Sequence, residues 1–254
     1  MTEVREVAIV GAGLLGLAAA RSLVMRGRDV VVLEQAHVGH DGAGSKGSCR
    51  IFRLGYVDPA YVAAARRAGE LWREVEAASG ARILLPTPQL TFGAGMRTVQ
   101  DAMLAARAPC ELLPAAEVAS RFPAIRAGGP ALLEPESAVI AAAPALAVLA
   151  AGAGEIRTGV RVVSIADDGR QVTLRTSTGL VTARTVIVTA GPWSGGVLAT
   201  AGVSVPTRPT LEQVGYVKPA AGSSEALSAP IFINYHEQSP YGLPVPFSSL
   251  CGPG

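Results

Sequence analysis

The sequence predicts an α/β fold built around a parallel sheet. Three observations support this class: two continuous apolar runs, a helical segment between them, and a glycine-rich turn that joins the first run to the helix. The first apolar run covers residues 7–10, and the second predicted strand, residues 29–33, is apolar after Asp29. An uninterrupted apolar run is typical of a strand that is covered on both faces, as in parallel sheets.

Composition excludes several classes of protein. The chain has 254 residues, of which 49% are hydrophobic and 17% are charged, so it is not intrinsically disordered. That length accommodates one large domain or two modest ones. The net charge of +2 argues against a dedicated nucleic-acid-binding protein. The three cysteines are scattered, which predicts neither a disulfide framework nor a zinc site and favours a cytoplasmic location. They are Cys49, Cys110 and Cys251.

An uncharged segment, residues 137–154, approaches the length of a membrane-spanning helix. It consists mostly of alanine and is interrupted by Pro144, Gly152 and Gly154. We therefore expect a short strand, a break, and a buried helix with Pro144 in its first turn. No membrane association is predicted.

The glycine-rich turn carries the first chemical motif, G-x-G-x-x-G. Gly11 permits a tight turn, Gly13 lets a pyrophosphate approach the backbone, and Gly16 allows close packing of the helix on the sheet. The free N–H groups of the helix N-terminus favour an anion. The cofactor-binding candidates here are Gly11, Gly13, Leu14, Leu15, Gly16 and Glu34.

Glu34 lies at the end of the second predicted strand, eighteen positions after Gly16. A carboxylate there can accept hydrogen bonds from both hydroxyls of an adenosine ribose, and it disfavours the 2′-phosphate of NADP. The complete pattern predicts a Rossmann-like dinucleotide-binding domain. The alternative is a glycine-rich turn in another α/β protein, and this motif leaves the choice between FAD and NAD open.

A polar, glycine-rich loop, residues 39–53, follows instead of another βαβ unit. This replacement disfavours an NAD-dependent dehydrogenase. Small residues and cations in such a loop can surround an anion or a polar ring, although a solvated surface loop has the same composition.

From this loop onward the sequence resembles the monomeric sarcosine oxidase and N-methyltryptophan oxidase family, within the D-amino-acid-oxidase-like flavoproteins. The matching motifs are Gly44-Ser45, Gly47-Ser48, Arg50-Ile51-Phe52-Arg53, Tyr56, Glu70-Leu71-Trp72, the Glu134-Pro135 segment and Pro240-Tyr241-Gly242-Leu243-Pro244. The resemblance implies FAD as cofactor. It also implies that the chain is C-terminally short, because family members continue beyond its last residue.

The resemblance assigns roles to individual residues. Arg50 is expected close to the flavin, Arg53 at the substrate carboxylate, and Tyr241 in the active-site lining. Lys46 stands where well-known members carry a histidine near the flavin, so we expect it and Arg50 to act in catalysis. The further residues expected at FAD are Gly44, Ser45, Arg50, Ile51, Val162, Thr189, Ala190, Gly191 and Trp193. Trp193 and Tyr241 also suit purely structural positions, and the histidines show no metal-ligand spacing.

The remaining pattern predicts helices over residues 58–79 and 115–122, and strands over residues 89–93, 155–157, 160–165, 171–175, 185–189, 211–218 and 231–235. By resemblance, residues 1–85 and 142–205 form the FAD-binding domain. Residues 86–141 and 206–254 form an interleaved α+β substrate domain, incomplete at the C-terminus.

The resemblance implies oxidation of a secondary or cyclic amine, or of an amino acid, to an imine. Electrons pass through the flavin to molecular oxygen. The alanine- and arginine-rich composition resembles that of a high-GC bacterial gene. The resembled family includes enzymes of specialised biosynthesis. The alternative is a non-catalytic FAD- or nucleotide-binding remnant that needs a partner chain.

Overall fold

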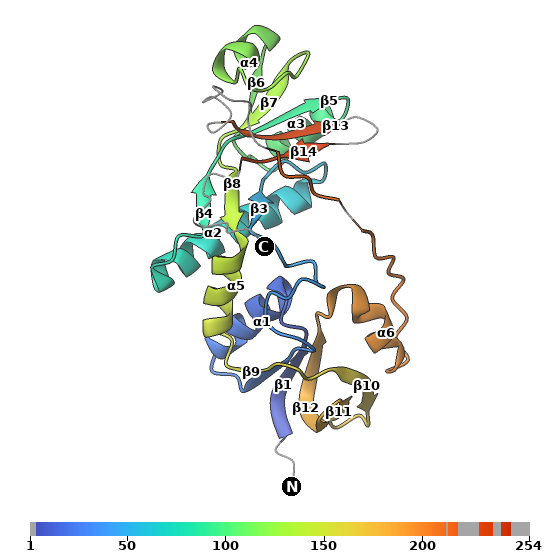
Figure 1. Ribbon diagram of the computed structural model, residues 1–254. Helices are drawn as coiled ribbons and strands as arrows, with labels where there is room; N and C mark the ends of the chain where they lie inside the picture. The colour runs from blue at the N-terminus through green and yellow to red at the C-terminus, as the bar shows by residue number, and fades with distance from the viewer. Residues whose placement is uncertain (1–3, 212, 218–228, 236–239, 245–254) are drawn as a thin grey trace. The chain divides into compact units, whose positions relative to one another are not determined.

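The computed structural model describes residues 4–211, 213–217, 229–235 and 240–244, and the chain divides into two compact units (Figure 1). Unit 1 comprises Met1–Gly47 and Ala142–Val214, and unit 2 comprises Ser48–Ala141 and Gly215–Gly254. Both units are therefore discontinuous in sequence.

A six-stranded sheet forms the centre of unit 1. In sheet order its strands are β10 (Val162–Asp167), β11 (Val172–Thr176), β12 (Gly179–Val188), β1 (Val4–Val10), β2 (Val30–Leu33) and β9 (Glu155–Arg157). The four strands from β12 to β9 run parallel, whereas β10, β11 and β12 form an antiparallel meander. The two apolar runs lie in β1 and β2, where Ile9 and Val32 are fully buried, which confirms the predicted parallel core.

The described part of unit 1 contains four helical segments: α1 (Leu14–Val24), α5 (Ala142–Ala151), the 3-10 helix η1 (Gly191–Trp193) and α6 (Ser194–Ala199). Helices α1 and α5 pack against each other. Helix α5 begins directly after strand β8, without the predicted break, and Pro144 occupies its first turn. Within the described residues, no helix has the length and apolar character needed to cross a membrane.

Strand β12 differs from the prediction for residues 185–189. Residues 185–188 form the end of a ten-residue strand and Thr189 lies just beyond it; Val181–Ala183 are buried, Thr185 is exposed and Val186–Val188 are half-buried. The predicted strand is therefore present up to Val188, but it begins at Gly179 and is only partly buried at its end. Val186 and Val188 pack only at the margin of the apolar cluster on this sheet.

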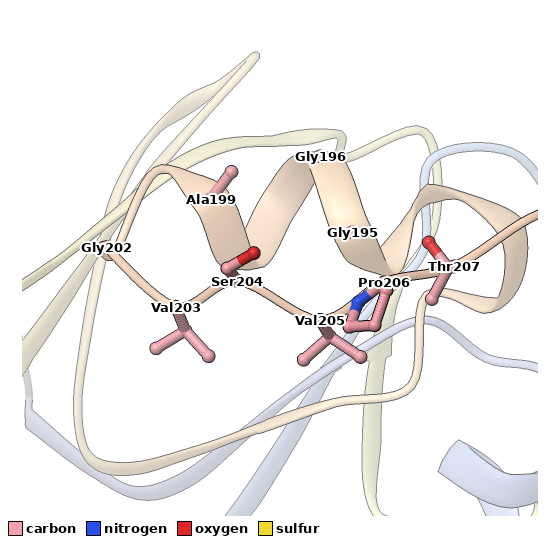
Figure 2. Close-up of a pocket in the computed structure, with 9 residues that line it drawn as sticks. All are labelled: Gly195, Gly196, Ala199, Gly202, Val203, Ser204, Val205, Pro206 and Thr207. Carbon is pink, nitrogen blue, oxygen red and sulfur yellow. The ribbon is translucent and has the colours of Figure 1, made fainter.

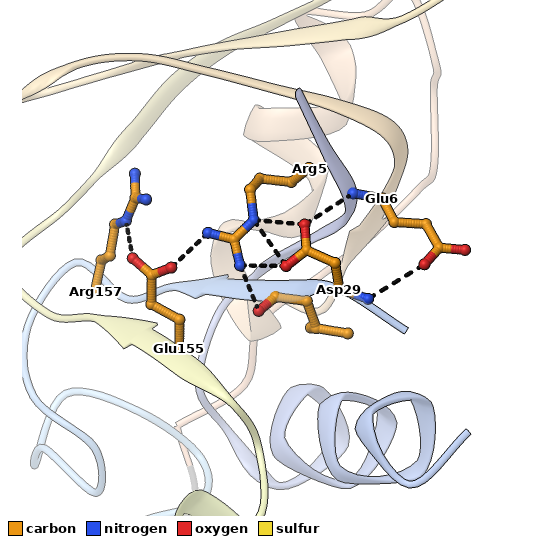
Figure 3. Close-up of polar contacts among 6 residues, drawn as sticks. Arg5, Glu6, Asp29, Glu155 and Arg157 are labelled. Atoms are coloured by element: carbon orange, nitrogen blue, oxygen red, sulfur yellow. Dashed lines mark hydrogen bonds and ion pairs between the residues drawn. The ribbon is translucent and has the colours of Figure 1, made fainter. Parts of the chain in front are cut away.

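An ion network joins the amino ends of β1, β2 and β9 (Figure 3). Arg5 on β1 donates from Nε to Oδ2 of Asp29 at 2.8 Å and also pairs with Glu155 on β9. Arg157 Nε donates to Glu155 Oε1 at 2.7 Å. The network lies at the opposite end of the sheet from the glycine motif, so it anchors neighbouring strands without entering the candidate cofactor site.

Unit 2 contains two sheets. The five-stranded sheet has the order β14 (Tyr241–Gly242), β13 (Ile231–Tyr235), β5 (Gln89–Gly93), β7 (Ala131–Glu134) and β6 (Glu111–Leu113). The three-stranded sheet has the order β3 (Cys49–Phe52), β8 (Ala138–Ala141) and β4 (Leu84–Pro86). The predicted strands over residues 89–93 and 231–235 are confirmed, and they pair in parallel.

Within the described residues, the helices of unit 2 are α2 (Pro59–Ser79), α3 (Met96–Ala105) and α4 (Ala115–Arg121). Asp58 caps α2 by accepting a 2.8 Å hydrogen bond from the Ala60 N–H, and Gly80 ends the helix in a left-handed conformation. Phe52 and Val62 share one apolar cluster with Val99 and Leu132. Residues 48–85, expected in the FAD-binding domain, therefore pack with residues 86–141, because β3 and β4 both pair with β8.

Two further expectations differ from the structure. The last part of the predicted loop 39–53 forms strand β3, because Cys49–Phe52 find a pairing partner in β8. Residues 211 and 213–217 form no strand, although a strand is predicted over residues 211–218, of which residues 212 and 218 lie outside the described part of the chain. No strand among the described residues pairs with them, and Leu211 is fully exposed.

Candidate cofactor and substrate sites

Two glycines of the G-x-G-x-x-G motif are required by the close approach of main-chain segments. Gly11 has φ +103°, and a Cβ there would stand 2.6 Å from the Thr189 carbonyl oxygen. A Cβ on Gly16 would stand 2.0 Å from the Gly11 carbonyl oxygen and 2.6 Å from Oγ1 of Thr189. Both glycines therefore allow helix α1 and the turn to pack against the end of β12.

Gly13 has different surroundings. The nearest atom to a Cβ built on Gly13 is the Ser45 hydroxyl oxygen, at 3.2 Å, rather than main chain. Gly13 is also the N-cap of α1 and supplies no side-chain cap, and the Leu14 N–H donates to Ser45 Oγ at 3.0 Å. The helix N-terminus thus presents backbone donors and a hydroxyl beside a position that lacks a side chain, which fits a phosphate group.

Glu34 directly follows β2 and is 6% exposed. Its Oε2 accepts a 2.9 Å hydrogen bond from the Ala12 N–H, and its Oε1 accepts a 3.0 Å hydrogen bond from the Ala36 N–H. Each carboxylate oxygen retains a lone pair for a hydroxyl donor. The carboxylate is therefore held at the glycine motif in an orientation that suits the two hydroxyls of a ribose.

An imidazole and an indole flank this carboxylate. His40 Nε2 lies 3.5 Å from Glu34 Oε1, while its Nδ1 accepts a hydrogen bond from the Gly42 N–H. The Trp193 ring lies 6.2 Å from the His40 ring, between centroids, and Trp193 is 42% exposed. Trp193 is thus a surface aromatic of unit 1 and not a core residue. Sequence reasoning gave His40 no role, because it lacked metal-ligand spacing.

The other candidates of unit 1 surround the same motif or lie on its sheet. Thr189 Oγ1 donates to the carbonyl oxygens of Val10 and Gly11, at 3.0 and 3.1 Å. Ala190 precedes η1, and Gly191 has φ +54° with open space beside it. Val162 is buried in β10. The exposed candidates of the loop after Glu34 are Gly44 and Lys46.

Together these residues fit a dinucleotide cofactor by their chemistry. A bare glycine at the N-terminus of a helix accommodates a pyrophosphate, and a fixed carboxylate eighteen residues later accommodates a ribose. The structure brings together Gly11, Gly13, Gly16, Glu34, Ser45 and Thr189 in unit 1.

In unit 2, Arg53 lies between two tyrosines. Its Cζ stands 4.6 Å from the centre of the Tyr56 ring, and its Nη1 donates to the Tyr235 hydroxyl at 3.4 Å. The side chain is half-buried. A guanidinium placed on an aromatic face keeps N–H groups available for a carboxylate. Sequence reasoning did not identify Tyr235, because it lies on β13, far away in the chain.

The other unit 2 candidates lie on strands. Arg50 and Ile51 pair with Ile140 and Val139 across β3 and β8, and Arg50 is exposed. Tyr241 pairs with Ile233 and is 60% exposed. Among the described residues, the hydrogen bond and the cation–π contact of Arg53 are made with Tyr235 and Tyr56 and not with Tyr241.

A buried polar cluster lies close to Arg53. Glu134, at the end of β7, is fully buried and accepts hydrogen bonds from Gln89, Thr91, Gly55 and Ser137. The sequence shows Glu134 only as part of a turn-like Glu-Pro segment. Its burial depends on the pairing of β5 with β7, which the sequence alone does not reveal.

A hollow on unit 1 lies between α6 and the segment that follows it (Figure 2). Its lining residues carry no ionisable side chain. They are Gly195, Gly196, Ala199, Gly202, Val203, Ser204, Val205, Pro206 and Thr207. The hollow contains none of the candidate residues. In the part of the chain that the structure describes, no cluster of three His, Cys, Asp or Glu side chains could hold a metal ion. His236, for which no metal-ligand role is predicted, lies outside that part.

A family model described as FAD dependent oxidoreductase matches residues 6–252 of this chain. Peroxisomal sarcosine oxidase of Homo sapiens is 28% identical over 250 residues, covering 93% of this chain and 64% of that protein. Monomeric sarcosine oxidase of Bacillus sp. (strain B-0618) is 28% identical over 261 residues, covering 98% of this chain and 66% of that protein. The chain thus spans slightly less than two thirds of these relatives.

A solved structure shows the same fold. The open form of NikD, described as an unusual amino acid oxidase essential for nikkomycin biosynthesis, has a TM-score of 0.70 and 26% sequence identity. The superposition covers 78% of this chain and 54% of NikD. The predicted α/β class and the predicted resemblance to sarcosine oxidases are therefore confirmed.

Proposed function

The chain belongs to the family of FAD dependent oxidoreductases, and on that premise we propose that it oxidises a secondary or cyclic amine, or an amino acid, with oxygen as electron acceptor. Unit 1 binds the adenosine and pyrophosphate of FAD, and unit 2 supplies groups that recognise the substrate. The relatives that carry sarcosine oxidase names support this choice of reaction.

The observation that carries the proposal is that Gly13 and Glu34 both belong to the glycine motif and its surroundings. Gly13 exposes the N-terminus of α1, and Glu34 is fixed by the Ala12 N–H of the glycine turn and by the Ala36 N–H that follows Glu34 in the chain. When bound, FAD supplies the two-electron acceptor for oxidation of the carbon beside the amine nitrogen. The protein holds the cofactor and orients the substrate.

Arg53 is the proposed anchor for a substrate carboxylate. Its guanidinium rests on Tyr56 and contacts the Tyr235 hydroxyl, so its orientation is restricted before a ligand arrives. Arg50, Lys46 and Tyr241 remain proposals that rest on their motif positions. A bidentate guanidinium–carboxylate pair favours amino acids over simple amines.

The visible spectrum of the purified protein tests the proposal directly. A yellow protein with flavin absorbance, bleached under anaerobic conditions by sarcosine, N-methyltryptophan or a cyclic amino acid, supports an amine oxidase. A colourless protein that binds no added FAD contradicts the flavin assignment. A yellow protein that none of these amines reduces supports the alternative of a non-catalytic binding protein.

Substitution of Arg53 tests the substrate assignment. We expect Arg53→Ala to raise KM for a carboxylate substrate about tenfold to a hundredfold, because charge-assisted hydrogen bonds contribute about 1.5–3 kcal/mol. FAD content should stay normal. Arg97→Ala removes an exposed cation from α3 of the same unit and serves as the matched control. An unchanged KM in Arg53→Ala would refute the assignment.

The proposed location is the cytoplasm. The cysteines are scattered in the sequence, and Cys49 and Cys110 are free thiols in the structure. Free thiols fit a reducing compartment. Imaging of a fluorescent fusion in the source cell would test the location.

A further inference from the structure

Glu134 is a fully buried carboxylate that lies on the five-stranded sheet of unit 2. It stands directly opposite Gln89 in the pairing of β5 with β7, and strands β5 and β7 lie side by side in Figure 1. Thr91, two residues along β5, points to the same face as Gln89, because side chains alternate along a strand. A charged residue at this place requires partners, since isolated buried charges are strongly unfavourable.

All four partners of Glu134 are hydrogen-bond donors. Oε1 accepts from Gln89 Nε2 at 2.6 Å and from Thr91 Oγ1 at 2.8 Å. Oε2 accepts from the Gly55 N–H at 2.8 Å and from Ser137 Oγ at 3.4 Å. An ionised carboxylate only accepts hydrogen bonds, so this donor set matches the charged form.

The Arg53 guanidinium acts electrostatically on Glu134. Burial raises the pKa of the Glu134 carboxyl above its usual value, although its hydrogen bonds and, least of all, the Arg53 guanidinium act in the opposite direction. Arg53 thus lies close enough for its charge to act on the carboxylate. Among the described side chains, Arg53 is the cation that influences Glu134 in this way.

The carboxylate also fixes the turn that follows Arg53. Gly55 is buried, and a Cβ there would stand 2.2 Å from Glu134 Oε1, so the backbone at Gly55 rests directly on the carboxylate. The next residue, Tyr56, carries the ring beneath the Arg53 guanidinium. One side chain therefore controls both the backbone after Arg53 and the aromatic surface on which Arg53 lies.

We propose that Glu134 is a positioning residue for Arg53: its buried carboxylate holds the Gly55 backbone, and with it the Tyr56 ring, so that Arg53 presents its guanidinium to a substrate carboxylate in one orientation. This inference rests on the proposed function of Arg53 as the carboxylate anchor. The inference predicts that Glu134 affects the KM of substrates that carry a carboxylate. It predicts no effect on recognition of the substrate's amine group.

Two matched substrates separate this role from a general structural one. The probes are sarcosine and its neutral amide, N-methylglycinamide, measured as separate KM and kcat values. In Glu134→Gln we expect KM for sarcosine to rise about tenfold to a hundredfold, because a small displacement of an orienting group has effects of this size. The KM for the amide should stay within about twofold, and FAD content should stay normal.

The control is Glu136→Gln, which makes the same chemical change two residues away at an exposed position. It should leave both KM values unchanged. If both substrates lose affinity equally in Glu134→Gln, or if only kcat falls, Glu134 is merely structural and the inference is wrong.

A second variant covers the case in which Glu134→Gln does not fold. Thr91→Val removes one donor to Oε1 while retaining the carboxylate and nearly the same side-chain volume. It should raise KM for sarcosine severalfold without changing KM for the amide, and equal KM changes would overturn the inference. A wild-type protein that binds no FAD or oxidises neither probe would instead contradict the proposed function.

Discussion

The Ala12 backbone N–H donates a 2.9 Å hydrogen bond to Oε2 of Glu34, a side chain that is only 6% exposed. Ala12 lies inside the glycine motif, and Glu34 follows the neighbouring strand β2. The bond joins the proposed phosphate-binding turn to the proposed ribose-binding carboxylate. Each part of the nucleotide site therefore helps to position the other.

Glu34→Gln should weaken FAD binding about tenfold to a hundredfold, because hydrogen bonds to a charged acceptor contribute about 1.5–3 kcal/mol. The amide also presents an N–H donor where Glu34 accepts from backbone donors. Titration of the apoprotein with FAD, followed by flavin fluorescence, measures the change. Asp41→Asn removes an exposed carboxylate from the following loop and should leave the affinity unchanged. Equal affinities in both variants would exclude Glu34 from the site.

Gly16→Ala should destabilise the protein by about 3 kcal/mol, the upper end for overpacking, because the new methyl group meets main chain. Its Cβ would lie 2.0 Å from the Gly11 carbonyl oxygen, and neither this atom nor Thr189 Oγ1 can move freely. Urea unfolding measures the effect. Gly196→Ala is the control, because α6 offers open space there and helices favour alanine by about 0.5–1 kcal/mol. Equal stabilities of the two variants would contradict the close approach of Gly16 to the Gly11 carbonyl oxygen.

The sequence predicts this part of the molecule well, since the motif reflects local geometry. The spacing of Gly11, Gly16 and Glu34 reports a turn, a helix contact and a strand end that lie within one βαβ unit. Glu134 could not be predicted in this way. Its partners Gln89 and Gly55 come from distant segments, and its environment arises only when β5 and β7 pair.

The predicted strand over residues 211–218 shows the opposite error. Its composition favours a strand, yet strand formation also requires a neighbour that supplies hydrogen bonds. Residues 211 and 213–217 have no such neighbour among the described residues. Propensity alone therefore predicted a strand that tertiary context does not provide.

The Arg5 network should stabilise unit 1 in a pH-dependent manner. Arg5 holds the pKa of the Asp29 carboxyl below its usual value, and Arg157 and Arg5 together lower the pKa of Glu155. A carboxyl with a lowered folded-state pKa contributes stability above its unfolded-state pKa, and this contribution disappears as pH falls through the folded-state pKa. The contribution should thus be complete at pH 7 and begin to fall below about pH 4, where the unfolded-state carboxyls become protonated.

The variant Arg5→Met tests this network. Because Asp29 and Glu155 are about half-exposed, we expect a loss of only about 1 kcal/mol at pH 7. The difference from the wild type should shrink at pH 3, as measured by urea unfolding at both pH values. Arg67→Met breaks an exposed helical pair on α2 and should leave stability unchanged at either pH. If Arg5→Met lowers the free energy of unfolding equally at both pH values, the packing of the Arg5 side chain, and not its ion pairs, accounts for the loss.

The Asp58 cap of α2 should contribute about 1 kcal/mol to the stability of unit 2, the usual value for an N-cap. Asp58 Oδ1 accepts the Ala60 N–H at 2.8 Å, and Pro59 at the first helical position has no N–H to satisfy. Asp58→Ala should therefore lower the free energy of unfolding by about that amount, whereas Asp58→Asn, which keeps the acceptor oxygen, should stay within a few tenths of a kcal/mol. Equal losses in the two variants would show that the charge at the helix N-terminus, and not the hydrogen bond, stabilises α2.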